Sequence, residues 1–434
     1  MKRTAYKKML QWKMSKRRKP LLVQGARQVG KTYLIQEFGK QEYQHFWYLN
    51  FEQNPDLKSL FSETLNPVQI IENLSLFLGH KIKATNTLIF FDEIQNAPNA
   101  LTSLKYFHES ASEFHIIAAG SLLGVQVAKE QSFPVGKVNF MNLYPMSFYE
   151  FLLAQDEQQL ADYITSKTDF NPIPTALHTK LLQLTKKYMF LGGMPEVIQT
   201  YLDTNDISQA RQIQNDILEA YSRDFSKYAS KQETIRITQV WRSIPYQLAK
   251  ENKKFMYQGI QKKARSSQFE QAIAWLQNAG LILIINNIST AKLPLSGYAN
   301  LAKFKIYLLD CGLLGALLQL APKTIVLGDS LFSDYNGAFT ENFVATELTA
   351  YGHSKLFYWT SNNKAEVDFV IQKSQSIIPI EVKSGLGKNL KSLRVFQQKY
   401  QSDTIYRISP RNYTQADDFI NLPFYGVKAF NHSS

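Results

Sequence analysis

The chain has 434 residues, of which 44% are hydrophobic and 20% are charged. This is the composition of a globular protein with roughly two to four domains, and it excludes a mainly disordered chain. A single cysteine, Cys311, excludes a disulfide framework and a zinc site built on several cysteines. It lies in an apolar run, so we expect it in the core. No signal peptide and no membrane-spanning run are visible, so we expect a cytoplasmic protein without membrane insertion.

The net charge of +13 is concentrated at one end of the chain. Residues 1–20 contain nine lysines and arginines and no acid. Such a segment can bind a phosphate backbone or an anionic membrane surface. We favour a solvated amphipathic helix that packs on the next domain through its apolar side chains. These are Met9, Leu10, Trp12 and Met14.

From Pro20 to Pro145, short apolar runs alternate with helical patterns. The predicted strands are 21–23, 46–51, 88–91, 114–119 and 137–143, and the predicted helices are 31–40 and 101–110. This alternation is typical of a parallel α/β sheet covered on both faces, which we assign to residues 1–145. We expect strand 114–119 to lie between 21–23 and 88–91.

The pattern changes after Pro145. Residues 146–230 are predicted to be mostly helical, and residues 231–321 to be helical with one β-like run at 281–285. Residues 328–337 are the expected boundary of a last α/β part. That part, within 325–434, has a predicted helix at 339–349 and two predicted strands at 367–371 and 377–382.

The strongest motif is a phosphate loop that fits G-x-x-x-x-G-K-[ST] at every fixed position, between a predicted strand and a predicted helix. Its residues are Gly25, Ala26, Arg27, Gln28, Val29, Gly30, Lys31 and Thr32. In such a loop, backbone N–H groups surround the nucleotide phosphates, Lys31 adds a positive charge and Thr32 offers a hydroxyl to Mg²⁺. ATP and Mg²⁺ are therefore the expected cofactors. The alternative is a glycine-containing turn with no ligand.

An acidic pair follows the predicted strand 88–91. In open α/β sheets, ligands bind at the carboxyl ends of the strands, so we expect Asp92 in the Mg²⁺ shell. Glu93 is placed to orient the attacking water, which favours a hydrolysing enzyme. Ser121, at the tip of the fourth strand, either senses the γ-phosphate or is an ordinary strand-end serine. Arg223 and Arg27 are candidates for the arginine that often completes such sites.

Six segments together resemble a large prokaryotic family of predicted AAA-type ATPases. They are 25–32, 48–52, 91–95, 119–121, 143–151 and 191–196. The C-terminal half of that family is a domain of unknown function, number 4143. The resemblance implies ATP binding, a helical lid at 146–230, a winged-helix part at 231–324 and a nuclease-like domain at 325–434. Likeness to AAA proteins suggests a ring-shaped oligomer, and a monomer is the alternative.

A helix is predicted from Ser266 to Asn278, with Phe269, Ile273 and Leu276 on one face and a strand directly after it. This order is similar to winged helix-turn-helix domains. Three cations precede the helix: Lys262, Lys263 and Arg265. DNA binding and simple packing against the lid are both open, and Trp275 belongs either to the core or to an interface.

Four polar residues near the C-terminus resemble the PD-(D/E)xK nuclease core. In that resemblance Asp368 and Glu381 bind a second Mg²⁺, Glu341 completes the shell and Lys383 helps to activate water. Glu381 and Lys383 are two apart on a predicted strand and so share a face. The alternative is a structural or docking module with a buried Glu–Lys pair.

These motifs lead to one hypothesis and two alternatives. The first is a Mg²⁺-dependent ATPase whose nucleotide state controls the C-terminal half, with DNA as a candidate partner. The second is a nucleotide-gated switch with little turnover that binds an unidentified protein partner. The third is an ATP-controlled DNA nuclease.

Overall fold

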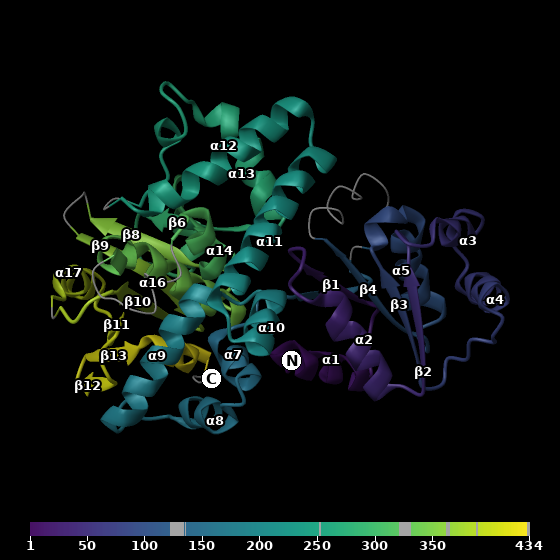
Figure 1. Ribbon diagram of the computed structural model, residues 1–434, viewed down its shortest axis with the longest axis horizontal. Helices are drawn as coiled ribbons and strands as arrows, with labels where there is room; N and C mark the ends of the chain where they lie inside the picture. Colours follow the sequence, from purple (N-terminus) through teal and green to yellow (C-terminus); the bar gives the residue numbers. More distant parts are fainter. Residues whose placement is uncertain are drawn as a thin grey trace. The chain divides into compact units, whose positions relative to one another are not determined.

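The computed structural model describes residues 1–121, 134, 136–250, 253–320, 331–361, 365–387 and 389–431. The chain divides into two compact units (Figure 1). The first contains Met1–Tyr144 with Asn278–Gly280. The second contains Pro145–Gln277 with Leu281–Ser434. Among the described residues, no helix is long and apolar enough to cross a membrane.

The first unit is built on a parallel five-stranded sheet in the order β2-β3-β4-β1-β5. Its strands are β1 (Leu21–Gly25), β2 (His45–Asn50), β3 (Thr87–Asp92), β4 (His115–Ser121) and β5 (Asn139–Asn142). Its helices are α1 (Thr4–Met14), α2 (Lys31–Glu42), α3 (Ser59–Ser62), α4 (Pro67–Leu78) and α5 (Pro98–Ser110). The predicted place of the fourth strand, between the first and the third, is confirmed.

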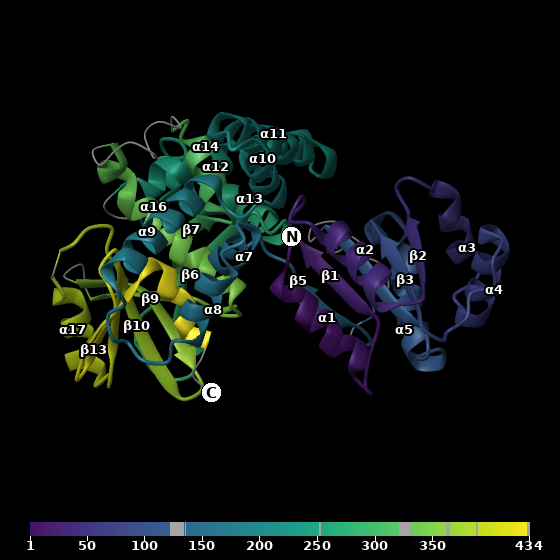
Figure 2. The same cartoon turned by 60° about the horizontal axis from the view of Figure 1, so that its bottom comes forward.

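Both faces of this sheet are covered, as predicted. Every residue of β3 is buried, and its neighbouring side chains point to opposite layers. Phe91 packs edge-on against Phe61 of α3, while Phe90 stacks on Phe46 of β2. Figures 1 and 2 show α1 and α2 on one side of the sheet and α3 and α4 on the other.

The basic N-terminal segment forms α1, which packs on the first unit. Met9 and Trp12 are buried as expected and Leu10 is partly buried, but Met14 is 79% exposed. The prediction for Met14 is wrong because residues two apart lie on opposite sides of a helix, so Met14 cannot share the face of Trp12. One of the cations of this segment interacts within the unit, because Lys13 Nζ lies 4.4 Å from the centre of the Tyr43 ring.

The second unit begins with helices, as predicted for residues 146–230. Its helices are α7 (Phe148–Ala154), α8 (Gln158–Ser166), α9 (Thr175–Leu191), α10 (Pro195–Thr204), α11 (Ile207–Tyr228), α12 (Lys231–Leu248), α13 (Ser266–Asn278), α14 (Cys311–Leu317), α16 (Leu331–Ala350) and α17 (Lys391–Tyr400). Cys311 is a free, buried thiol, as expected.

The second unit also contains an eight-stranded mixed sheet in the order β12-β13-β11-β10-β9-β8-β6-β7. Its strands are β6 (Ile282–Ile288), β7 (Ala299–Leu308), β8 (Phe357–Ser361), β9 (Ala365–Lys373), β10 (Ser376–Val382), β11 (Ile405–Ser409), β12 (Thr414–Ala416) and β13 (Phe419–Pro423). Figure 2 shows the broad strands β9 and β10 within it.

This sheet corrects two predictions. Residues 231–321 contain a second strand, β7, and the described residues of the C-terminal part form six strands instead of two. The expected wing strand, β6, pairs with β7 and also runs parallel to β8, so one sheet continues across the predicted boundary at residue 324. Strand β7 was not predicted because its sequence has no continuous apolar run. Much of its first half is exposed, and its buried half contains Lys305.

Most of the predicted boundary region, residues 328–337, is helical. Residues 321–330 lie outside the described part of the chain, but α16 begins at Leu331, eight residues before the predicted helix start. Helix α17 packs on this sheet and places Phe396 edge-on against Trp359 of β8, with ring centres 5.2 Å apart.

Candidate functional site

The carboxyl ends of four neighbouring strands bring the predicted residues of the first unit to one edge of the sheet. In the strand register, Gly25 of β1 lies opposite Ser121 of β4. Asn50 of β2 lies opposite Asp92 of β3. This is the edge at which open parallel sheets bind ligands.

The phosphate loop links β1 to α2 with left-handed backbone at Gln28 (φ 64°) and Gly30 (φ 89°). Lys31 is buried, and its Nζ donates to the carbonyls of Gly25 (3.0 Å) and Ala26 (2.8 Å). Burial lowers the pKa of Lys31 to about 8, although the nearby Glu93 and Asp92 carboxylates oppose this shift. The ammonium therefore rests on neutral carbonyl oxygens, which an anionic phosphate can replace with stronger partners.

Asp92 lies at the centre of a hydrogen-bond chain. Thr32 Oγ1 donates to Asp92 Oδ2 (2.9 Å), and Tyr48 from β2 donates to the same oxygen (3.0 Å). Asn50 Nδ2 in turn donates to the Tyr48 hydroxyl (2.9 Å). Burial raises the pKa of Asp92, whereas the bonds from Thr32 and Tyr48 act against this change.

Glu93 follows Asp92 in an unusual backbone conformation, with φ 53° in the left-handed region. Non-glycine residues in this region carry strain, and such strain is concentrated at functional sites. The backbone N–H of Glu93 donates to Asp92 Oδ1 (3.0 Å), and Gln95 Nε2 donates to the Glu93 carboxylate. The half-buried carboxylate is thus held in a defined direction beside the loop.

The residues present fit Mg²⁺ and ATP. The Thr32 hydroxyl and the Asp92 carboxylate are in contact and supply the hard oxygen ligands that Mg²⁺ prefers. The loop offers a helix N-terminus at α2 and the Lys31 ammonium to phosphate oxygens.

Sequence reasoning missed three side chains of this site: Tyr48, Asn50 and Gln95. The segments 48–52 and 91–95 carried the signal, since both belong to the family resemblance, but no role was assigned to these residues. Their side chains hold the two acidic residues, Asp92 and Glu93.

The remaining candidates of the nucleotide site lie in different places. Ser121 is buried beside the loop, and Arg27 is half-buried within it. Arg223 belongs to the second unit, where it is exposed on α11 and pairs with Glu219 (2.5 Å). The roles given to these three residues stay predictions.

The predicted helix from Ser266 to Asn278 is present as α13. Phe269, Ile273 and Leu276 are buried on one face as expected. Trp275 lies edge-on to Phe225 of α11, with ring centres 5.3 Å apart, so it belongs to the packing between these helices.

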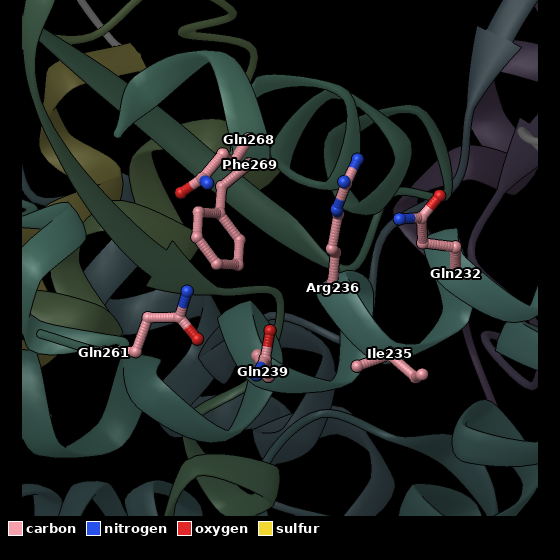
Figure 3. Close-up of a pocket in the computed structure, with 7 residues that line it drawn as sticks. All are labelled: Gln232, Ile235, Arg236, Gln239, Gln261, Gln268 and Phe269. Atoms are coloured by element: carbon pink, nitrogen blue, oxygen red, sulfur yellow. The ribbon is translucent and has the colours of Figure 1, made fainter. Parts of the chain in front are cut away.

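A pocket of about 220 Å³, lined by polar and apolar side chains, opens between α12 and α13. Its lining consists of Gln232, Ile235, Arg236, Gln239, Gln261, Gln268 and Phe269. Figure 3 shows the Arg236 side chain rising beside this space, with Gln268 and Phe269 across from it. The three cations that precede α13, at positions 262, 263 and 265, are exposed.

The C-terminal carboxylates lie among lysine side chains, and their role as a second Mg²⁺ shell stays a prediction. Glu341 and Asp368 converge, but the Nζ of Lys305 lies 3.7 Å from each of them. Glu381 pairs with Lys383 (2.5 Å), as a Glu–Lys pair at the end of β10. Within the described ranges, no three His, Cys, Asp or Glu side chains are grouped so that they could hold a metal ion.

Comparisons with known proteins agree with the resemblance seen in the sequence. The AAA domain family matches residues 17–152, and a domain of unknown function (DUF4143) matches residues 336–425. Another domain of unknown function (DUF8612) matches residues 182–324. No curated protein matches the chain.

Solved structures similar to this chain include a Walker-type ATPase of Pyrococcus abyssi, at 13% identity and a TM-score of 0.46, covering 73% of this chain and 95% of that one. The Orc1 protein of Aeropyrum pernix, solved in complex with DNA, is 11% identical with a TM-score of 0.30. The match covers 73% of this chain and 90% of that one. A signal transduction ATPase with numerous domains from Pyrococcus horikoshii is 14% identical with a TM-score of 0.26. The match covers 77% of this chain and 45% of that one.

The chain thus joins a P-loop sheet domain, with its phosphate loop and acidic pair at one sheet edge, to a larger helical and β unit. It contains an AAA domain at residues 17–152 and, behind it, the domain of unknown function DUF4143 at residues 336–425.

Proposed function

We propose that this protein binds Mg²⁺-ATP at the phosphate loop and hydrolyses it. The observation that supports this most directly is the contact of Thr32 with Asp92, next to the buried Lys31 and the constrained Glu93. These four residues have the chemistry that phosphoryl transfer to water requires: positioning and charge stabilisation around the phosphates.

Each residue has a defined part in this proposal. Lys31 moves its ammonium from the loop carbonyls to the β- and γ-phosphates. Thr32 and Asp92 hold Mg²⁺, which supplies charge neutralisation at the phosphates. Glu93 orients the attacking water, and Gln95 keeps the Glu93 carboxylate in place.

We further propose that nucleotide state is passed to the second unit through residues 143 and 144. Leu143 N donates to Gln24 O (2.7 Å), and Gly25 lies so close to the Leu143 carbonyl that a Cβ there would overlap it. Arg3 donates to Val29 O in the loop (2.9 Å) and to Tyr144 O (2.6 Å). The phosphate loop is therefore tied by hydrogen bonds to the segment that leads into Pro145.

The test is ATP binding and steady-state hydrolysis by matched variants. Lys31→Ala should abolish ATP binding, while Glu93→Gln should bind ATP and turn it over poorly. Lys40→Ala, an exposed lysine on the same helix, is the control and should behave like the wild type. Normal turnover in Glu93→Gln would remove its assigned role. Tight ATP binding with almost no wild-type turnover would favour the nucleotide-gated switch.

A second candidate function is DNA binding by the surface around α12 and α13. The observation that favours it is the pocket, because Arg236 and several glutamine amides are suited to phosphates and base edges. Replacing Lys262, Lys263 and Arg265 together by alanine should flatten the salt dependence of duplex binding. Lys292→Ala, an exposed lysine elsewhere in the unit, is the control. Unchanged binding in the triple variant would remove this candidate.

A further inference from the structure

Lys305 is a fully buried lysine on β7, the last strand in the order of the second unit's sheet. It extends from β7, and its side chain has no exposed surface. Its Nζ lies 2.5 Å from Glu366 Oε1, 3.7 Å from Glu341 Oε2 and 3.7 Å from Asp368 Oδ1. Three carboxylates from β9 and α16 therefore share one ammonium group.

The same carboxylates have further donors. Lys253 Nζ binds Glu341 Oε1, and the buried Tyr307 hydroxyl donates to Glu341 Oε2 (2.7 Å). The backbone N–H of Val382 donates to Asp368 Oδ2 (2.8 Å). Two cations and two neutral donors are thus already placed around the centre that the nuclease resemblance assigns to Mg²⁺.

The electrostatics of the cluster agree with this arrangement. Burial disfavours the charge of Lys305, but Glu341, Asp368 and Glu366 together raise its pKa above the ordinary value. Burial also works against the charge of Glu341, yet Lys305 and Lys253 hold the pKa of that carboxyl low. Burial and the neighbouring Glu341 raise the pKa of Asp368 to about 7.

We infer that the Lys305 ammonium takes the place of the divalent cation in this nuclease-like centre, which is an ion cluster that neither binds Mg²⁺ nor cleaves nucleic acid. Mg²⁺ needs oxygen ligands at roughly 2.0–2.1 Å in near-octahedral geometry. The Nζ occupies the point where Glu341 and Asp368 converge and repels a second cation there. A buried ion cluster of this kind loses stability when one partner is removed, because an unpaired buried charge remains.

Mn²⁺ titration of the full chain without nucleotide, followed by electron paramagnetic resonance, tests the inference. The wild type should show no saturable Mn²⁺ site in this unit up to millimolar concentration. Lys305→Met keeps the length of the side chain but removes its charge, and it should gain one Mn²⁺ equivalent at least tenfold tighter than any wild-type site. Adding Asp368→Asn to this variant should abolish the gained site.

Two further measurements keep the result decisive. Lys303→Met changes an exposed lysine on the same strand and should gain no Mn²⁺ site. If Lys305→Met does not fold, the wild type and Asp368→Asn decide alone. A saturable Mn²⁺ site in the wild type that disappears in Asp368→Asn, or metal-dependent DNA cleavage lost in that variant, would overturn the inference. Equal Mn²⁺ titrations for the two proteins, without such cleavage, would uphold it.

Discussion

Gly193 lies in the turn between α9 and α10, where the backbone of the second unit crosses itself. Met146 N donates to Gly193 O (2.6 Å), and the buried Tyr188 hydroxyl donates to Met146 O (2.5 Å). A Cβ on Gly193 would overlap this same Met146 carbonyl oxygen. Gly193→Ala must therefore push the two backbone segments apart.

The cost can be worked from these contacts. Overpacking of a close contact costs about 1–3 kcal/mol, and the two buried hydrogen bonds that would be strained are worth about 1 kcal/mol each. We expect Gly193→Ala to lower the unfolding free energy of the second unit by ~3–5 kcal/mol. For a unit of this size, the melting temperature should fall by on the order of 10 °C.

Urea unfolding followed by tryptophan fluorescence measures this loss, with ATP binding as a separate report on the first unit. Gly297→Ala is the matched control, because no atom lies within 4 Å of a Cβ at that position. It should change stability by no more than about 0.5 kcal/mol. If the two glycine variants were equally stable, the argument from close backbone approach would be refuted.

Three further predictions concern hydrogen-bonded carboxylates. Gln95→Leu frees the Glu93 carboxylate and should lower steady-state turnover by roughly tenfold with ATP affinity unchanged; an equal loss of both would contradict the positioning role. Tyr48→Phe removes a donor to Asp92 and should weaken ATP binding by roughly fivefold with Mg²⁺ but not in its absence, measured with a fluorescent ATP analogue. Glu347 is fully buried, and burial raises its pKa from 4.5 to about 7. Between these two pH values the carboxyl group keeps its proton in the folded state, whereas the unfolded state has lost it. Wild-type stability should therefore fall by on the order of 3 kcal/mol more than that of Glu347→Gln between pH 4.5 and 7.5, as measured by urea unfolding; parallel pH curves would exclude this.

The arrangement of the proposed nucleotide site could be predicted from sequence because its parts are local. Lys31 and Thr32 lie in one loop, Asp92 directly ends an apolar strand, and the carboxyl ends of parallel strands meet at one edge. The partners of these residues could not be predicted in the same way. Tyr48 reaches Asp92 only through the pairing of β2 with β3, which joins residues far apart in the chain.

The sheet of the second unit was largely missed for the same reason. Its strands β6 and β8 pair across some seventy residues, as Asn286 with Phe357 shows. Lys305 also interrupts the apolar pattern of β7, and a lysine in a short run indicates an exposed segment unless its partners are known. Those partners come from other elements, β9 and α16, so the buried charge becomes understandable only in the folded chain.

Four of the six segments that resemble the AAA-type family fall into two physical classes. Those at 25–32, 48–52 and 91–95 place side chains that contact one another at the nucleotide edge. The segment 191–196 has a structural role, because a Cβ on Gly192 would overlap the buried Asp310 carboxylate, which accepts from Gly193 N (2.5 Å) and from Leu313 N (2.9 Å). These glycines permit a backbone crossing and carry no ligand chemistry. Resemblance in the first class therefore supports a shared reaction, whereas resemblance in the second supports only a shared fold.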